Sequence, residues 1–295
     1  MVEKELSNSV INLEGSTFNL GNDNLNFIEN AKYNAKQHEY LFHCTSMDVL
    51  LSIIKNKEFW LTNLKYVNDI EEYNRINKSE YENSFYVACF TYENDIPKSH
   101  WIEYGTLDNG ILFSVKRDWF DKSITLLTDL NQEMSEPRIY PSFNKAIESG
   151  DNPCYFNFEF DFYQIIYDND LKKKIYGNGK LISGENELNM KSVVPSVAGI
   201  IKNKSGICER RESTPYEKDW SSEKEVRLKL GIMSPNDLMK GPSSPISTKI
   251  AVSLNDNAFE KFQIRFSPKI SEEKKESFIK ELYKLLPSSN IKILQ

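Results

Sequence analysis

Short apolar runs separated by polar segments recur along the chain from about residue 39 onwards. Runs of about 4–8 residues that are apolar throughout, or that alternate with polar residues, predict β-strands. The segment 84–91 predicts a buried strand, and 155–167 alternates aromatic and polar residues as a half-buried strand does. Strands are predicted over residues 39–45, 59–62, 84–91, 110–115, 155–167, 225–232, 249–254, 263–266 and 290–294.

Helical spacing of apolar residues appears in fewer places. Helices are predicted after the capping residue Ser46, over 70–82, 97–105 and 193–207, and over 271–286 with Ser271 as its cap. The expected apolar faces are Val49, Leu50, Ile53 and Ile54 in the first helix and Phe278, Leu282 and Leu285 in the last.

This order of elements predicts a single α+β domain over residues 39–295, with a mixed or split β-sheet core and flanking helices. Residues 263–294 predict a βαβ unit. Residues 1–38, rich in Asn and Ser, are expected to form an N-terminal extension with a short strand at 16–20. Residues 168–191 are polar and contain three glycines, which is typical of a mobile loop or an insertion.

Charge and composition narrow the possible functions. The net charge of −6 over 295 residues argues against a sequence-independent nucleic-acid binder, which needs a net basic face. Basic residues gather at 172–174 and 202–211, as solvated surface charge or as a local basic cleft. The absence of a signal core and of any apolar run of about 18 residues predicts a cytoplasmic protein without membrane contact.

The metal-ligating residues are few. The four cysteines lack the spacing of a structural zinc site, and three histidines make a multi-histidine metal site hard to build. We therefore expect no metal. Cys44 and Cys89 lie in apolar runs and are predicted to be buried thiols.

His43-Cys44-Thr45 at the end of a predicted strand is the first candidate for chemistry. His43 and Thr45 point to the same face of an extended chain and can together hold a ribose hydroxyl or a phosphate. The alternative is a structural histidine that bonds a nearby backbone carbonyl.

Glu223-Lys224-Glu225 is the second candidate. If the segment is extended, both carboxylates face one side, their titrations are coupled, and one carboxylate can stabilise an oxocarbenium-like cation. The alternatives are an exposed strand edge with solubilising charges, or an internal salt-bridge network with Arg227.

Three further positions complete the candidate site. Trp101 and Tyr104 lie three residues apart on a predicted helix and either line a pocket that stacks a planar ring or belong to the core. Asn68, followed by Asp69, predicts a turn or a brace for the cleft.

Several of these motifs, taken in order, resemble the bacterial family called domain of unknown function 2971. The resemblance spans residues 40–295 and is carried by Leu41-Phe42-His43-Cys44-Thr45-Ser46, Phe59-Trp60-Leu61-Thr62-Asn63, Asn68-Asp69-x-x-Glu72, Trp101-x-x-Tyr104-Gly105, Gly110-Ile111-Leu112-Phe113 and Trp220-x-x-Glu223-x-Glu225-x-Arg227. Cys44 and Ile70 stand where that family has Tyr and Pro. The first motif also resembles ADP-ribosyltransferases related to DarT toxins and RNA 2′-phosphotransferases.

The resemblance implies an ADP-ribosyltransferase-like fold that uses NAD as substrate, without a metal. It implies that His43 and Thr45 bind NAD, that Glu225 is catalytic, and that Glu223 orients the acceptor. Either Tyr104 or Tyr66 would stack on nicotinamide. The acceptor would be a protein or a nucleic acid, and the biological role that of a toxin or anti-phage effector with a possible partner protein.

Two other functions compete with this one. The first is a non-catalytic nucleotide-sensing or interaction module of a defence system. The second is a metal-dependent nuclease using Asp69, Glu223 and Glu225, which is disfavoured by the net negative charge and by the absence of a well-placed lysine after an acidic pair.

Overall fold

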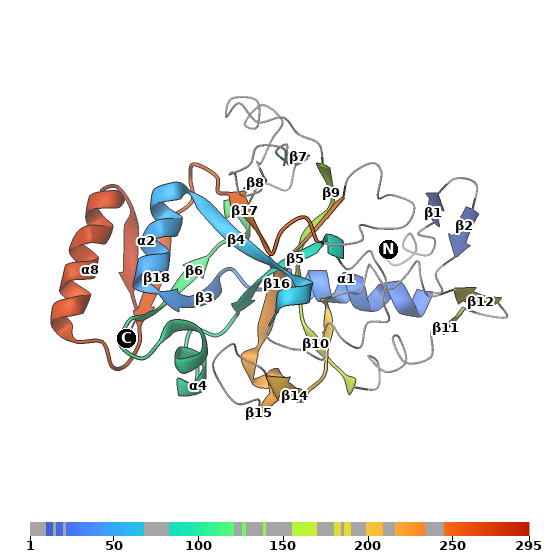
Figure 1. The fold of residues 1–295 in the computed structure, drawn as a ribbon, viewed down its shortest axis with the longest axis horizontal. Coiled ribbons are helices and arrows are strands. Elements are labelled where there is room, and N and C mark those ends of the chain that lie inside the picture. Colours follow the sequence, from blue (N-terminus) through green and yellow to red (C-terminus); the bar gives the residue numbers. More distant parts are fainter. Residues whose placement is uncertain are drawn as a thin grey trace, which may run out of the picture.

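A mixed sheet with few helices forms the fold, as expected for the α+β class (Figure 1). The computed structural model describes residues 10–13, 16–19, 22–67, 83–120, 126–127, 138–139, 155–169, 180–183, 186–189, 199–208, 216–233 and 245–294. The turn expected at Asn68-Asp69 and the helix expected over 70–82 lie outside these residues.

The main sheet has eleven strands among the described residues. In spatial order they are β16 (Glu225–Met233), β9 (Tyr155–Gln164), β7 (Leu126–Leu127), β8 (Arg138–Ile139), β17 (Lys249–Ser253), β4 (Glu58–Asn63), β5 (Phe85–Thr91), β3 (Leu41–Ser46), β6 (Gly110–Val115), β18 (Lys261–Phe266) and β19 (Asn290–Ile293). Strands β18 and β19 are parallel and flank helix α8 (Glu272–Leu285), which confirms the predicted βαβ unit.

Smaller pairings surround this sheet. They are the antiparallel hairpins β1–β2 (Val10–Leu13 and Ser16–Asn19), β11–β12 (Lys180–Ser183 and Asn186–Asn189) and β14–β15 (Ser205–Cys208 and Tyr216–Asp219), and the parallel pair β10–β13 (Ile166–Tyr167 and Ile201–Lys202). The remaining helices are α1 (Asn22–Lys36), α2 (Met47–Asn56), α4 (Lys98–His100), the π-helical turn η3 (Trp101–Gly105), and the 3-10 turns η1 (Leu64–Tyr66), η4 (Arg117–Trp119) and η6 (Trp220–Glu223).

Strand β5 is where the sheet divides. One edge of β5 pairs with β16 over its whole length, and because β16 also pairs with β9, the sheet turns back on itself. The other edge pairs with β4 at Tyr86 and Val87 and with β3 only at Thr91. Strands β3 and β4 therefore separate, and among the described strands none pairs with residues 88–90 on that edge.

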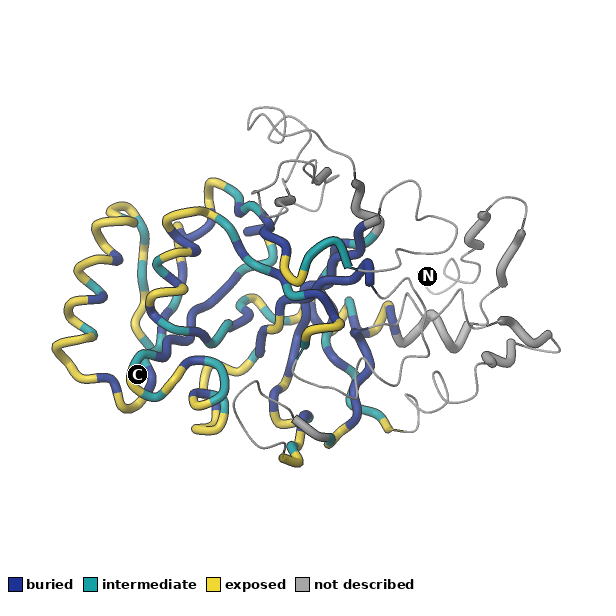
Figure 2. The backbone as a smooth tube through the Cα atoms, viewed as in Figure 1, coloured by how far each residue is buried: buried dark blue, intermediate teal, exposed yellow. Residues whose placement is uncertain are grey.

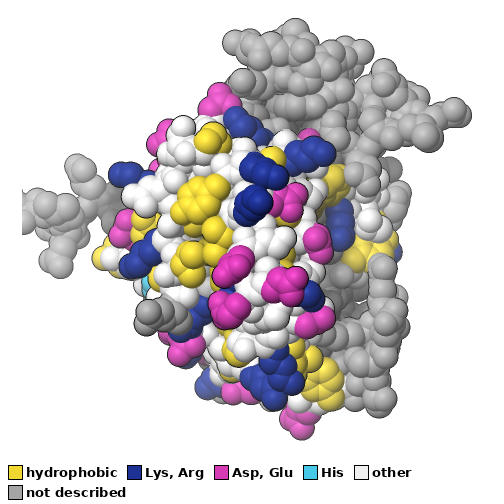
Figure 3. All heavy atoms as spheres, turned by 90° about the vertical axis from the view of Figure 1, so that its left-hand side faces the viewer, with side chains coloured by type: hydrophobic (Ala, Val, Ile, Leu, Met, Phe, Trp, Pro, Cys, Tyr) yellow, Lys and Arg dark blue, Asp and Glu magenta, His cyan; other side chains and the backbone are white. Residues whose placement is uncertain are grey.

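The core lies between the sheet and helices α2 and α8, whose outer faces remain exposed (Figure 2). Ser46 and Ser271 cap these helices as predicted, accepting hydrogen bonds from the backbone N–H of Val49 and Lys274. On the face of the molecule that carries these helices, side chains of both charges surround a small group of hydrophobic ones (Figure 3).

Two residues predicted for the apolar helix faces are exposed instead. Val49 is 45% exposed and Leu285 is 39% exposed, whereas Leu50 and Leu282 are fully buried. Each exposed residue lies at the margin of an apolar stripe, where helical periodicity alone does not distinguish the core from the rim.

Three larger segments also differ from expectation. The predicted helix over 193–207 is wrong for its described part, because residues 201–202 and 205–208 form strands. Part of the expected loop at 168–191 forms the β11–β12 hairpin. The expected N-terminal extension over 1–38 contains helix α1, and Ala35 in this helix belongs to the main core. No described helix is long and apolar enough to cross a membrane.

Candidate functional site

His43 fills the gap left where β3 diverges from β5. Its Nδ1 lies 2.9 Å from the backbone carbonyl oxygen of Cys89, and because a carbonyl only accepts, Nδ1 carries the proton. The ring is surrounded by Phe59, Phe90 and Phe113, with centroids 5.0–5.6 Å away. His43 thus makes the backbone contact expected of a structural histidine, and Nε2 is left as its acceptor atom.

Glu223 and Glu225 converge by a route that extended geometry does not predict. Glu223 ends the turn η6, Lys224 has left-handed backbone angles (φ 49°, ψ 47°), and Glu225 begins β16. A left-handed non-glycine residue costs about 1–2 kcal/mol, so surrounding contacts must hold this turn. Lys202 is one such contact, because its Nζ lies 3.4 Å from Glu223 Oε2 and 3.1 Å from Glu225 Oε2.

Two more cations complete a buried ionic cluster. Lys218 Nζ lies 2.6 Å from Glu223 Oε1, and Arg227 Nε lies 2.6 Å from Glu225 Oε1. Trp220 supports the two lysines, with its ring centroid 4.1 Å from Lys202 Nζ and 4.7 Å from Lys218 Nζ. This arrangement is the internal salt-bridge network that the sequence left as an alternative for the Glu-x-Glu pair.

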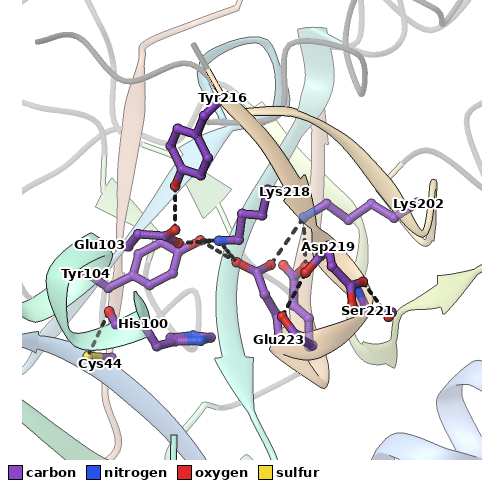
Figure 4. Close-up of polar contacts among 12 residues, drawn as sticks. Cys44, His100, Glu103, Tyr104, Lys202, Tyr216, Lys218, Asp219, Ser221 and Glu223 are labelled. Atoms are coloured by element: carbon purple, nitrogen blue, oxygen red, sulfur yellow. Dashed lines mark hydrogen bonds and ion pairs between the residues drawn. The ribbon is translucent and has the colours of Figure 1, made fainter. Parts of the chain in front are cut away.

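Tyr104 links the cluster to the π-helical turn η3. Its hydroxyl donates a 2.6 Å hydrogen bond to Glu223 Oε1. The neighbouring Glu103 accepts hydrogen bonds from both Lys218 and Tyr216 of strand β15 (Figure 4). The turn after α4 and the β14–β15 hairpin therefore meet at the carboxylate pair.

A cavity opens beside this cluster. It encloses about 400 Å³, counting its mouth open to solvent, of which about 70 Å³ is accessible to the centre of a water molecule. This is room for several waters or one ring-sized group. The lining residues are Phe42, His43, Cys44, Cys89, Phe90, Thr91, His100, Tyr104, Glu223 and Glu225.

Cys89 is exposed rather than buried as the sequence predicted. It lies deep within the structure but faces the cavity, so water reaches it. Burial raises the pKa of its thiol, and the nearby Glu225 carboxylate raises that pKa further. The Cys89 thiol is therefore protonated at neutral pH and is not a ready nucleophile.

The carboxylates remain ionised despite their burial. Burial by itself raises the pKa of Glu225, but Arg227 and Lys202 outweigh this effect and hold the pKa well below its usual range. For Glu223, burial again raises the pKa and Lys202 lowers it, with a net lowering. The site therefore presents two carboxylate anions compensated by buried cations.

The structure brings together four of the predicted site residues, namely His43, Tyr104, Glu223 and Glu225, around one cavity. The other predicted residues lie elsewhere or outside the described chain. Thr45 is buried, Tyr66 is 44% exposed on η1, and neither is among the described residues that line the cavity. Trp101 packs in a separate apolar cluster with Phe42, and Asn68 lies outside the described residues.

Sequence reasoning missed His100, Lys202 and Lys218. Lys202 was expected to carry solvated surface charge or to line a local basic cleft, but it is 3% exposed and contacts both carboxylates. Its apolar neighbours Ile200 and Ile201 were the available signal, because a lysine within an apolar run is often buried with a partner. His100 lies next to Trp101, but nothing in the local pattern indicates that it faces Glu223.

Among the described residues, no group of three or more His, Cys, Asp or Glu side chains is arranged to hold a metal ion. No known family model matches the chain, and no match was found among curated proteins or solved structures. We therefore base the function proposed below on the geometry of the site and on the motif resemblance.

Proposed function

We propose that this protein is an NAD-consuming, ADP-ribosyltransferase-like enzyme whose catalytic carboxylate is Glu225. The observation that carries the proposal is the convergence of Glu225, Glu223, His43 and Tyr104 on one cavity at the division between β3 and β5. The cavity accepts one ring-sized part of a dinucleotide, and the rest of NAD would lie across its mouth.

The chemistry requires an anion beside the reacting ribose. Loss of nicotinamide leaves positive charge on the ribose, which an ionised carboxylate in a poorly hydrated site stabilises. Glu225 fulfils this requirement because Arg227 and Lys202 keep its pKa low although it is 3% exposed. Glu223, whose carboxylate accepts a hydrogen bond from the Tyr104 hydroxyl, would orient the acceptor.

The motif resemblance supports the biological part of the proposal. On that basis the protein acts as a bacterial toxin or anti-phage effector, and its acceptor is a protein or a nucleic acid. NAD is its substrate, and the proposed reaction needs no metal.

Incubation of the purified protein with labelled NAD and cell extract tests the proposal. We expect the parent to consume NAD or transfer the label. The rate should fall at least about 100-fold in Glu225→Gln, which keeps the side-chain shape and removes the charge. Glu272→Gln on the exposed face of α8 is the matched control and should match the parent. Equal rates for the parent and Glu225→Gln would refute the assignment of Glu225 as the catalytic carboxylate.

One observation favours a second candidate, the non-catalytic nucleotide-sensing module. Both oxygens of Glu225 are already occupied, Oε1 by Arg227 and Oε2 by Lys202 at 3.1 Å. Such a closed network can bind a ligand without turning it over. Calorimetric titration with NAD, followed by a measurement of the NAD that remains after prolonged incubation, distinguishes the two, because the sensor binds NAD in saturable fashion and leaves it intact.

A further inference from the structure

His100 is a cavity-lining histidine without a role in the function described so far. It ends helix α4, and its ring lies against Tyr104 with centroids 4.9 Å apart. Its backbone carbonyl accepts a 3.9 Å hydrogen bond from the Cys44 thiol, which ties this turn to β3. Its imidazole extends beneath Tyr104 on the side of Glu223 (Figure 4).

His100 lines the cavity, and among the residues that the structure describes none hydrogen-bonds its ring nitrogens. His43, by contrast, has its Nδ1 committed to the Cys89 carbonyl.

The other cavity groups are poor proton acceptors. Burial raises the pKa of the Cys44 thiol to about 12, and burial together with Glu223 raises the pKa of Tyr104 well above its usual range, so both groups stay protonated. The carboxylates of Glu223 and Glu225 have lowered pKa values and are weak bases.

The surroundings of the two histidines distinguish them as bases. The His43 ring lies among three phenylalanines, where an imidazolium cation is costly to form. Charged groups face His100 from four elements, namely Glu103 on η3, Lys218 on β15, Glu223 on η6 and Glu225 at the start of β16. The carboxylates favour a proton on the ring of His100, and Lys218, Lys202 and Arg227 balance part of their charge.

His100 is nevertheless neutral before reaction. Burial lowers its pKa from the ordinary value of 6.5, and the opposing effect of Glu223 does not restore it. A neutral ring with an open nitrogen and nearby carboxylates is the arrangement of a general base.

We propose that His100 is the general base that takes the proton from the attacking group, and that the acceptor is therefore a group that loses a proton as it attacks, with a hydroxyl or water as the case written here. The inference rests on the proposed function. The ribose C1′–N bond breaks and its electron pair leaves with nicotinamide, while the acceptor oxygen forms a bond to C1′. The hydroxyl proton moves to a ring nitrogen of His100 and then to solvent. A carboxylate acceptor carries no proton at neutral pH and needs no such base.

The test compares the pH dependence of NAD consumption in the parent, His100→Gln and the control His38→Gln, whose ring stacks on Tyr92 and does not line the cavity. The parent and the control should lose activity on the acidic side of the ordinary histidine pKa of 6.5, because burial lowers the pKa of His100. His100→Gln should lose about 100-fold or more at pH 7.5 and lack this acidic limb, and added imidazole should restore part of its activity.

The possible results distinguish the role of His100 as base from the proposed NAD-consuming function. If Glu225→Gln is inactive while His100→Gln keeps parental activity and an unchanged acidic limb, the base is not His100 and the proposed function stands. If the parent consumes no NAD, both are overturned. A readout that needs no activity is histidine NMR, which is tractable because the chain has three histidines. A charged His100 imidazole at pH 7.5 would overturn the inference, whereas a neutral one supports it.

Discussion

Removal of the Lys202 charge should destabilise the fold. Lys202 is 3% exposed, and its Nζ contacts both buried carboxylates and the ring of Trp220. Loss of one partner from a buried ion pair costs about 3–5 kcal/mol. Glu225 keeps Arg227 and Glu223 keeps Lys218, so we expect the low end of this range, about 3 kcal/mol, for Lys202→Met, which preserves most of the apolar stem.

The loss should depend on pH in a defined direction. The folded pKa values of Glu223 and Glu225 are lowered, so these groups stabilise the fold above their unfolded pKa near 4.5, and this contribution is lost as the pH falls. Without Lys202 both pKa values rise and this stabilisation shrinks. The difference between parent and variant should be largest near pH 7.5 and should narrow below about pH 4.5.

Urea denaturation, followed by fluorescence and circular dichroism at about pH 7.5 and pH 4, measures both quantities. Lys57→Met is the matched control, because its pair with Asp256 at 3.1 Å is exposed and should contribute no more than about 0.5 kcal/mol. A loss below about 1 kcal/mol for Lys202→Met, or the same loss at both pH values, would refute the idea that this lysine holds the carboxylate pair.

Three further changes test other parts of the structure. His43→Gln should lower the free energy of unfolding by about 1–2 kcal/mol, because the contact with the Cys89 carbonyl is lost. Burial lowers the His43 pKa below that of the unfolded chain, so the parent loses stability as the pH drops below about 6.5 and the variant should lose less; parallel pH–stability curves would contradict this. Leu282→Ala should cost about 2–5 kcal/mol in denaturant unfolding and Leu285→Ala far less; similar losses would show that helix α8 is seated differently. Ser271→Ala should cost about 1 kcal/mol through loss of the helix cap, and an unchanged unfolding midpoint would count against that cap.

Local sequence patterns predicted the strands and helices in which buried residues recur at the regular spacing of that element. The strands over 84–91 and 110–115 and the helix over 271–286 were found because alternation, apolar runs and a capping serine act between neighbours in sequence. The helix predicted over 193–207 was wrong because Pro195, Gly199 and Gly206 disfavour a helix there, and Ile201 and Lys202 pair with a strand more than thirty residues earlier in the chain. Such pairing has no local signal.

The candidate site was predictable in part for the same reason. Glu225, at the start of a strand, was placed correctly because its neighbours alternate. The residues around Glu225 were not predicted, because Lys202 comes from a different element and the ring position of His100 depends on how the turn after α4 packs against β15. A buried carboxylate needs a charged partner, so the existence of such a partner can be predicted from one sequence. Which residue it is cannot be predicted when the partner lies far away along the chain.

Lys224 connects the local pattern to the chemistry of the site. Extended geometry at residues 223–225 would place both carboxylates on one face of a strand, but Glu223 belongs to the turn η6 and only Glu225 to β16. With Lys224 in the left-handed conformation between them, both carboxylates lie within 3.4 Å of a single amine, Lys202 Nζ. One amine shared by two carboxylates couples their protonation, so a ligand that displaces Lys202 from Glu225 must alter Glu223 as well. The acceptor side and the ribose side of the proposed reaction would thus respond to the same lysine.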